Sequence, residues 1–120
     1  MNVKAREHAD RWLAAWNGRD LDGVIDCYSD DVEFEAETVV RRWNRPDGRL
    51  QGREELRQHF QMGLDLAPEL RFSEEAFLLA PSGYTLVYRR ENGNLVADVV
   101  EQDSQGLARR VRAFYQERPR

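Results

Sequence analysis

The stretch that most constrains the fold spans residues 11–34 and reads RWLAAWNGRDLDGVIDCYSDDVEF. Up to the stop signal Asn17-Gly18, apolar residues recur at the spacing of one helix face: Ala5, Ala9, Trp12, Leu13 and Trp16. After Asp20, a residue suited to cap a helix, a second such face follows: Leu21, Val24, Ile25 and Tyr28. Residues 32–36 then alternate like a strand. The stretch therefore predicts two short amphipathic helices that lead into a strand.

The rest of the chain predicts one more helix and four strands. The helix begins after Gly52 and ends before Pro68. Strands are expected over residues 70–80, 84–91, 94–103 and 107–115. Residues 38–51 indicate a loop or an irregular strand pair, in which Trp43 either covers a pocket or anchors the loop.

These elements predict a single α+β domain over residues 1–120, a length that suits one core with a modest cavity. Long antiparallel strands curl with their intrinsic twist, and three helices would cover the concave face of the sheet. Helices that close the wide end of such a cone leave a cavity, which is the default ligand site in a small domain. We therefore expect a cone-shaped α+β barrel that encloses a pocket.

Asp98 is a carboxylate inside an otherwise apolar strand, LVADVV. The period of two places Val96 and Val100 on its side of the strand, toward the expected cavity. Burial of an unpaired carboxylate is costly, so its pKa should rise or it should have a partner. Two roles remain open, a functional acid and a structural acid that holds a neighbouring group.

The partner of Asp98 depends on the register of the hairpin at Asn92-Gly93. A two-residue turn pairs Val87 with Asp98 and places Arg89 diagonally beside the acid, where it would keep the acid ionised. A slip of one residue would instead turn Tyr88 inward and favour a neutral Asp98. The two-residue turn is the simpler geometry and is the register predicted here.

Composition excludes several classes of protein. A net charge of −4 argues against nucleic acid as a partner, and the basic runs at residues 41–45 and 109–112 are expected to be solvated faces. The single Cys27 suits a reducing compartment. Without a membrane-length apolar run or a signal-peptide core, we expect a cytoplasmic protein. His8 and His59 lie on separate predicted helices without nearby companions, so no metal site is expected.

Three segments together resemble the nuclear-transport-factor-two-like superfamily, most closely its SnoaL-like and ketosteroid-isomerase-like branch. They are RWLAAWNGRDLDGVIDCYSDDVEF, GREELRQHFQMGL and VADVVEQDSQGLARRVRAFY. The resemblance covers nearly the whole chain and is weakest over residues 38–51. It implies the cystatin-like fold, a pocket between helices and sheet, a homodimer formed through the outer sheet face, and chemistry without metal or cofactor.

The resemblance also assigns roles by position. Ketosteroid isomerase uses a general-base Asp, a Tyr and a protonated Asp in an apolar site. The protonated acid falls on Asp98, the tyrosine on Trp12, and the general base on Ala36, which can do no proton chemistry. Glu35 and Glu37 flank Ala36, but strand alternation points both to the opposite face. True steroid isomerase activity is therefore not expected.

The predicted pocket combines aromatic residues of the helices and first strand with every second residue of the later strands. The expected site residues are Asp98 and Trp12 as catalytic groups, and Trp16, Tyr28, Phe34, Phe60, Val87, Arg89, Val100, Val111 and Ala113 as the lining. The aromatic residues could equally be plain core.

Three functions remain open at this point. The first is a cofactor-free isomerase, cyclase or hydratase that acts on a small, largely apolar molecule, with Asp98 as acid or base and Trp12 as donor to an oxyanion. The second is a binding or accessory module of the same fold, which the alanine at position 36 favours. The third is an epoxide-hydrolase-like activity, which would need Asp98 and Arg89 together with a second Asp.

Overall fold

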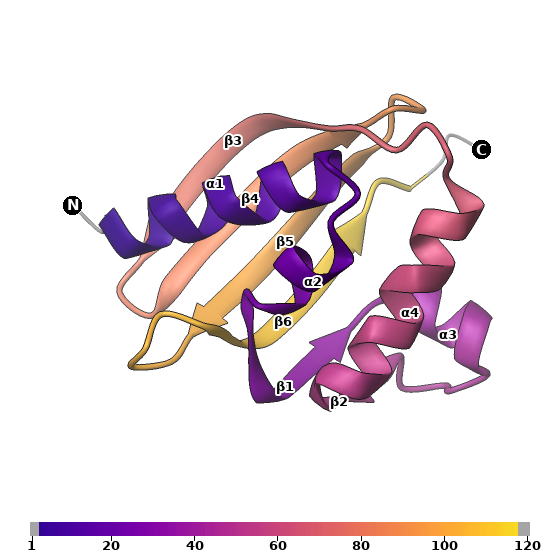
Figure 1. Ribbon diagram of the computed structural model, residues 1–120, viewed down its shortest axis with the longest axis horizontal. Helices are drawn as coiled ribbons and strands as arrows, with labels where there is room; N and C mark the ends of the chain where they lie inside the picture. The colour runs from indigo at the N-terminus through magenta and orange to yellow at the C-terminus, as the bar shows by residue number, and fades with distance from the viewer. Residues whose placement is uncertain (1–2, 118–120) are drawn as a thin grey trace.

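The computed structural model describes residues 3–117 and folds them into four helices and six strands (Figure 1). In chain order these are α1 (Val3–Asn17), α2 (Leu21–Ile25), β1 (Tyr28–Glu35), α3 (Glu37–Trp43), β2 (Arg49–Gln51), α4 (Gly52–Leu66), β3 (Phe72–Ala80), β4 (Gly83–Arg90), β5 (Leu95–Gln102) and β6 (Ala108–Tyr115).

The strands form one sheet in the order β2-β1-β6-β5-β4-β3. All neighbouring strands are antiparallel except β1 and β6, which run parallel. Helix α1 packs against β3 and β4, whereas α4 packs against β1, and both helices lie on the same side of the sheet (Figure 1). The predicted α+β class, with helices on a mostly antiparallel sheet, is confirmed.

The first two helices form where the sequence predicts them. Helix α1 ends at Asn17, and the side chain of Asp20 caps α2 by accepting a hydrogen bond from the backbone N–H of Gly23 at 3.0 Å. The prediction that Tyr28 belongs to the second helix is wrong. Because α2 is a single turn that ends at Ile25, Tyr28 instead begins β1, where its side chain is almost completely buried.

Helix α3 was not predicted, because residues 38–51 were expected to be a loop or an irregular strand pair. Its Thr38, Val39 and Val40 are β-branched, which lowers intrinsic helix propensity. Burial of Thr38 and Val39 against the core overrides that preference. Asn44 ends the helix in the left-handed conformation, which is a common C-terminal cap.

The predicted register of the β4–β5 hairpin is wrong by one residue. Leu86, and not Val87, is paired with Asp98. The cause is the turn, in which the N–H of Gly93 donates to the carbonyl of Arg90 at 2.9 Å and the N–H of Arg90 donates to the carbonyl of Asn94 at 2.8 Å. Gly93 alone has a positive φ, of 88°, so the loop has three residues with a glycine bulge in place of a two-residue turn.

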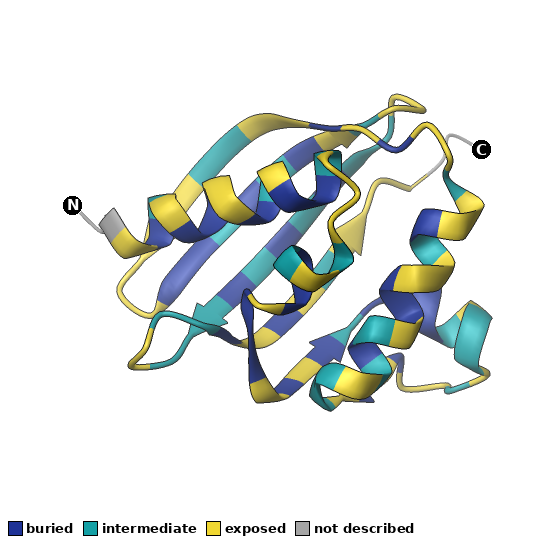
Figure 2. Cartoon of the chain, in the orientation of Figure 1, coloured by how far each residue is buried: buried dark blue, intermediate teal, exposed yellow. Residues whose placement is uncertain are grey.

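The core lies between the helices and the covered face of the sheet, as the burial pattern of α1 shows in Figure 2. On β5 the residues Val96, Asp98 and Val100 are buried, and the residues between them are only partly buried. The opposite face of the sheet carries an apolar row across three strands, formed by Val87, Ala97 and Phe114. Within residues 3–117, no helix is long and apolar enough to span a membrane.

Candidate functional site

A cavity of about 420 Å³ lies between the helices and the covered face of the sheet. Helices α1, α3 and α4 line it together with strands β1, β3, β4, β5 and β6. Its apolar wall is largely aromatic: Trp12, Trp16, Phe34, Phe60 and Phe72. The rings of Trp16 and Phe60 meet edge to face with their centres 4.9 Å apart, which is a favourable aromatic geometry. The volume and the apolar wall suit a small molecule with rings.

Asp98 lines this cavity and is only 5% exposed. Its Oδ1 accepts a long hydrogen bond from the hydroxyl of Tyr88, at 3.4 Å. Burial raises the pKa of Asp98 to about 7, and the hydrogen bond from Tyr88 acts in the opposite direction. No cation contributes to this pKa among the residues that the structure describes. Both protonation states of Asp98 are therefore populated near neutral pH.

Tyr88 takes the place beside Asp98 that the predicted register gave to Arg89. The three-residue turn makes Tyr88 the diagonal neighbour of Asp98 on the covered face. Arg89 instead lies on the opposite face and is exposed, with its Nε 2.6 Å from Oε1 of Glu75. Val87 is also on that face, paired with Ala97. The predictions that Val87 and Arg89 line the pocket are therefore wrong.

Trp12 lines the cavity, but its indole N–H is already used. It donates to the hydroxyl of Tyr28 at 2.8 Å, and both residues are buried. An indole has a single donor, so Trp12 has none left for a ligand. The Tyr28 hydroxyl accepts that bond and keeps its own proton to donate. The predicted role of Trp12 as a donor to an oxyanion is therefore not supported by this geometry.

The other predicted lining residues fall into two groups. Trp16, Phe34, Phe60 and Ala113 line the main cavity. Tyr28, Val100 and Val111 lie behind it and line a second cavity of about 10 Å³, to which Asp98 also contributes. That volume is at the lower limit for one water molecule.

His59 lines the cavity, although it is not among the site residues predicted from the sequence. It is 3% exposed, and its Nδ1 accepts a hydrogen bond from the indole N–H of Trp43 at 3.1 Å. The proton of the neutral ring must then be on Nε2, which lies 3.1 Å from Oγ1 of Thr38 and donates to it. Burial lowers the pKa of His59 to about 4, and the charge of Arg42 acts in the same direction. His59 is thus a neutral group that orients Thr38.

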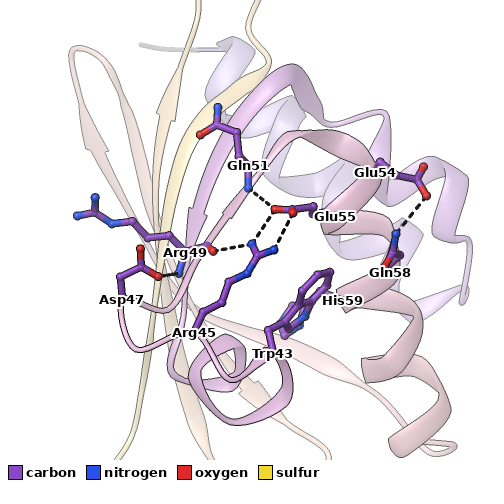
Figure 3. Close-up of polar contacts among 9 residues, drawn as sticks. All are labelled: Trp43, Arg45, Asp47, Arg49, Gln51, Glu54, Glu55, Gln58 and His59. Carbon is purple, nitrogen blue, oxygen red and sulfur yellow. Dashed lines mark hydrogen bonds and ion pairs between the residues drawn. The ribbon is translucent and has the colours of Figure 1, made fainter.

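Trp43, the last residue of α3, anchors the end of that helix against α4, as Figure 3 shows. Nearby, the guanidinium of Arg45 forms two hydrogen bonds of 2.9 Å with the carboxylate of Glu55 in the first turn of α4. Glu55 also accepts from the backbone N–H of Gln51 at 2.9 Å. These contacts lower the pKa of Glu55 to about 2, with Arg45 as the main cause. They hold α3, and thus one wall of the cavity, beside α4.

His8 belongs to a separate buried group behind the cavity. Its Nε2 lies 2.7 Å from the carbonyl oxygen of Cys27, which can only accept, so Nε2 carries the proton. Its Nδ1 then accepts from the hydroxyl of Tyr84 at 2.6 Å. Burial lowers the pKa of His8 and raises the pKa of the Cys27 thiol to about 11, so the thiol is unreactive.

The position that the resemblance assigns to a general base holds no acid. Ala36 is buried at the start of α3 and is not part of the cavity wall. Glu35 lies 3.5 Å from Arg49 in an ion pair, and Glu37 is exposed. Within residues 3–117, no cluster of three or more His, Cys, Asp or Glu side chains could hold a metal ion.

The comparisons agree with this fold. The family model of the SnoaL-like domain matches residues 9–116. A SnoaL-like protein of unknown function from Burkholderia thailandensis has a similar structure, with a TM-score of 0.92 and 26% identity over 98% of both chains. TerC has a TM-score of 0.78 and 14% identity, over 95% of this chain and 92% of its own. A candidate ketosteroid isomerase from Kribbella flavida has a TM-score of 0.73 and 17% identity, over 98% of this chain and 81% of its own.

No match was found among curated proteins. The family model nevertheless covers most of the chain, from the second turn of α1 to the residue after β6. The protein belongs to the SnoaL-like family.

Proposed function

We propose that the protein is a cofactor-independent enzyme that transfers a proton on a small, largely apolar carbonyl compound. The observation that carries this proposal is the environment of Asp98. It is the one buried carboxyl group among residues 3–117, it lines an aromatic cavity, and its pKa is raised to about 7. A general acid or base is most effective when its pKa is close to the working pH.

In the proposed step, the ionised carboxylate of Asp98 takes a proton from the carbon next to the substrate carbonyl. The C–H electron pair becomes the double bond of an enolate, and the negative charge moves to the carbonyl oxygen. Asp98 then returns the proton to another carbon of the conjugated system, which completes an isomerisation. Ala36 offers no second base, so Asp98 has to perform both transfers.

The hydroxyls near Asp98 support its dual role. Tyr88 donates to Oδ1 and stabilises the carboxylate form. Trp12 donates to Tyr28, which leaves the proton of Tyr28 directed away from the indole. Burial, and after it the charge of Asp98, raises the pKa values of Tyr28, Tyr84 and Tyr88, so these hydroxyls stay neutral donors at physiological pH.

The structural neighbours support a pocket that takes small molecules. TerC was crystallised with polyporic acid, and the Kribbella flavida neighbour is a candidate ketosteroid isomerase. A binding module without catalysis is the second candidate, favoured by the absence of an acid at position 36. The epoxide-hydrolase-like reading loses its support, because Arg89 lies outside the cavity.

The experiment that tests the proposal follows deuterium uptake from D₂O into the activated methylene of 2-tetralone, a bicyclic ketone, by NMR. The wild type should accelerate uptake, and Asp98→Asn should abolish the acceleration. Asp65→Asn is the matched control, because Asp65 is exposed on α4 and, within residues 3–117, accepts a hydrogen bond only from Gln61. Equal rates in wild type and Asp98→Asn would contradict catalysis by Asp98. Binding of 2-tetralone without accelerated uptake would favour the binding module.

We further propose that a second copy of the chain covers the outer face of the sheet. Val87, Ala97 and Phe114 form an apolar row there, and Leu78, Thr85 and Val99 lie in the next row. Phe114 and Leu78 are 49% and 58% exposed. An antiparallel sheet with one face in water normally carries polar residues on that face. An apolar outer face therefore supports a partner that also offers a flat apolar sheet.

A further inference from the structure

Arg42 is a half-buried arginine on the cavity wall. It lies in the last turn of α3, four residues after Thr38, so both side chains project from the same face of the helix. Both also line the cavity. This wall therefore presents a guanidinium and a hydroxyl to the space that contains Trp16 and Phe60.

Arg42 has no partner among residues 3–117, because it forms no hydrogen bond, ion pair or ring contact there. Its neighbours differ in this respect. Arg45 is paired with Glu55 at 2.9 Å, and Arg90, on the same cavity, is paired with Glu91 at 3.1 Å. Burial is the main cause that lowers the pKa of Arg42, and the charges of Arg41 and Arg90 act in the same direction. Tyr115 acts in the opposite direction, but no carboxylate does. The positive charge is thus partly desolvated and without a counterion.

Helix α4 carries a glycine, Gly63, beside Arg42. A Cβ on Gly63 would lie 3.7 Å from Nη1 of Arg42, so even the smallest side chain would reach the guanidinium. Thr38 strengthens the same site. Since His59 donates to Oγ1 of Thr38, the hydroxyl proton of Thr38 is free to donate to another acceptor. The Tyr115 hydroxyl, at 3.4 Å from Oγ1, is a distant competitor for it.

We propose that Arg42 and Thr38 bind the carboxylate of an aromatic or polycyclic acid whose rings pack against Trp16 and Phe60. This proposal rests on the proposed function and narrows its substrate class to acids, with the reacting end of the molecule directed toward Asp98. The guanidinium matches the planar, two-oxygen geometry of a carboxylate. An unpaired carboxylate on the ligand supplies the missing counterion.

A structural role at the end of α3 does not explain the burial of Arg42. A cation in the last turn of a helix interacts favourably with the helix dipole. Arg41 lies in the same turn and provides this interaction while it is exposed. Arg41 is therefore the matched control, because its substitution removes the same charge from the same helix end without a change in the cavity.

The experiment compares the binding of 2-naphthoate with that of 2-naphthamide, a neutral probe of nearly the same shape. Binding is followed at pH 6, where Asp98 is mostly protonated, through the fluorescence of Trp12 and Trp16. The wild type should bind the carboxylate about tenfold more tightly than the amide, as a charge-assisted hydrogen bond implies. Arg42→Gln should remove the preference, whereas Arg41→Gln should keep it.

Equal affinity of the wild type for both probes would overturn the proposal. The same holds if Arg41→Gln loses the preference as fully as Arg42→Gln, or if neither probe binds up to about 1 mM. Asp98→Asn separates this inference from the proposed function, because it should keep the carboxylate preference while it abolishes deuterium uptake by 2-tetralone. If the wild type prefers the carboxylate probe but does not accelerate deuterium uptake, the protein is an acid-binding module in which Asp98 performs no catalysis.

Discussion

The hydroxyl of Tyr88 lies 3.4 Å from Oδ1 of Asp98, and the two residues are diagonal neighbours on the buried face of the β4–β5 hairpin. This is the one hydrogen bond that the Asp98 carboxyl forms within residues 3–117. Its length leaves burial as the dominant influence on the pKa of Asp98. The protonation of a single carboxyl group therefore links the stability of the fold to the chemistry of the cavity.

The pH dependence of stability should reveal Asp98. The ordinary pKa of an aspartate side chain is 3.8, and the pKa of Asp98 in the folded protein is about 7, so between these pH values the folded state keeps a proton that the unfolded state has lost. The free energy of unfolding should then fall as pH rises through this window, by up to about 4 kcal/mol. Urea denaturation of wild type and Asp98→Asn at a series of pH values measures the difference.

Comparison of the wild type with Asp98→Asn separates the contribution of Asp98 from those of two buried histidines, which change the stability with pH in the opposite direction. The pKa values of His8 and His59 are lowered by burial, so their contributions decrease stability as pH falls. These contributions cancel when the variant is subtracted from the wild type. A difference that does not change with pH would mean that the carboxyl group is not buried.

Removal of the Tyr88 hydroxyl should raise the pKa of Asp98 further. The hydrogen bond stabilises the carboxylate, so Tyr88→Phe should increase the pKa by up to about one unit. The carboxyl carbon of Asp98, followed by ¹³C NMR, reports this titration. Tyr84→Phe is the control, since the Tyr84 hydroxyl bonds to His8 and not to Asp98. An equal shift in both variants would argue against a specific role for Tyr88.

Trp12 and Tyr28 should be energetically coupled through their hydrogen bond of 2.8 Å. Trp12→Phe also changes the volume of the core, and a double-mutant cycle with Tyr28→Phe removes that effect. We expect a coupling free energy of about 1 kcal/mol, measured by chemical denaturation of the four proteins. A coupling below about 0.3 kcal/mol would mean that the indole N–H has another acceptor.

His59 should remain neutral down to about its folded pKa of 4 and carry its proton on Nε2. Two-bond ¹H–¹⁵N NMR spectra distinguish this tautomer directly. Because the folded pKa lies below the ordinary value of 6.5, stability from this group should fall as pH drops from 6.5 toward 4. Trp43→Phe removes the donor to Nδ1 and should let the two tautomers mix. An unchanged tautomer in that variant would show that Thr38 alone orients the ring.

The outer face of the sheet should hold the dimer together. Phe114→Asp places a charge in the apolar row of β4, β5 and β6 and should convert a dimer into a monomer in sedimentation equilibrium. Met62→Asp on α4 is the control, because Met62 is also exposed but lies on a helix. A monomeric wild type, or dissociation by the control as well, would contradict this interface.

The sequence predicted correctly those structural features that depend only on residues close together in the chain. The helical spacing of apolar residues in α1 and α4 and the cap at Asp20 each predicted an element that the structure contains. The period of two in β5 likewise placed Asp98 on the buried face, because alternation is a property of the strand itself. The family resemblance then supplied the arrangement of these elements.

Tertiary structure decided two features that the sequence did not predict, the helix α3 and the register of the β4–β5 hairpin. The β-branched residues of α3 favour a strand, and only burial of Val39 and the contacts of Thr38 and Trp43 with His59 make a helix there. The turn at Gly93 admits two loop lengths that differ by one residue, and the choice between them brings Tyr88 inside and leaves Arg89 outside.

The amino-acid sequence by itself determined which residues form α1, α4 and the β4–β5 hairpin, and on which side of its strand Asp98 lies, since these follow from spacing along one chain segment. Only the folded structure decided which groups surround that carboxyl and where the unpaired charge of Arg42 lies. Such neighbours come from segments far apart in the chain, and their positions are fixed by packing, which no local spacing records.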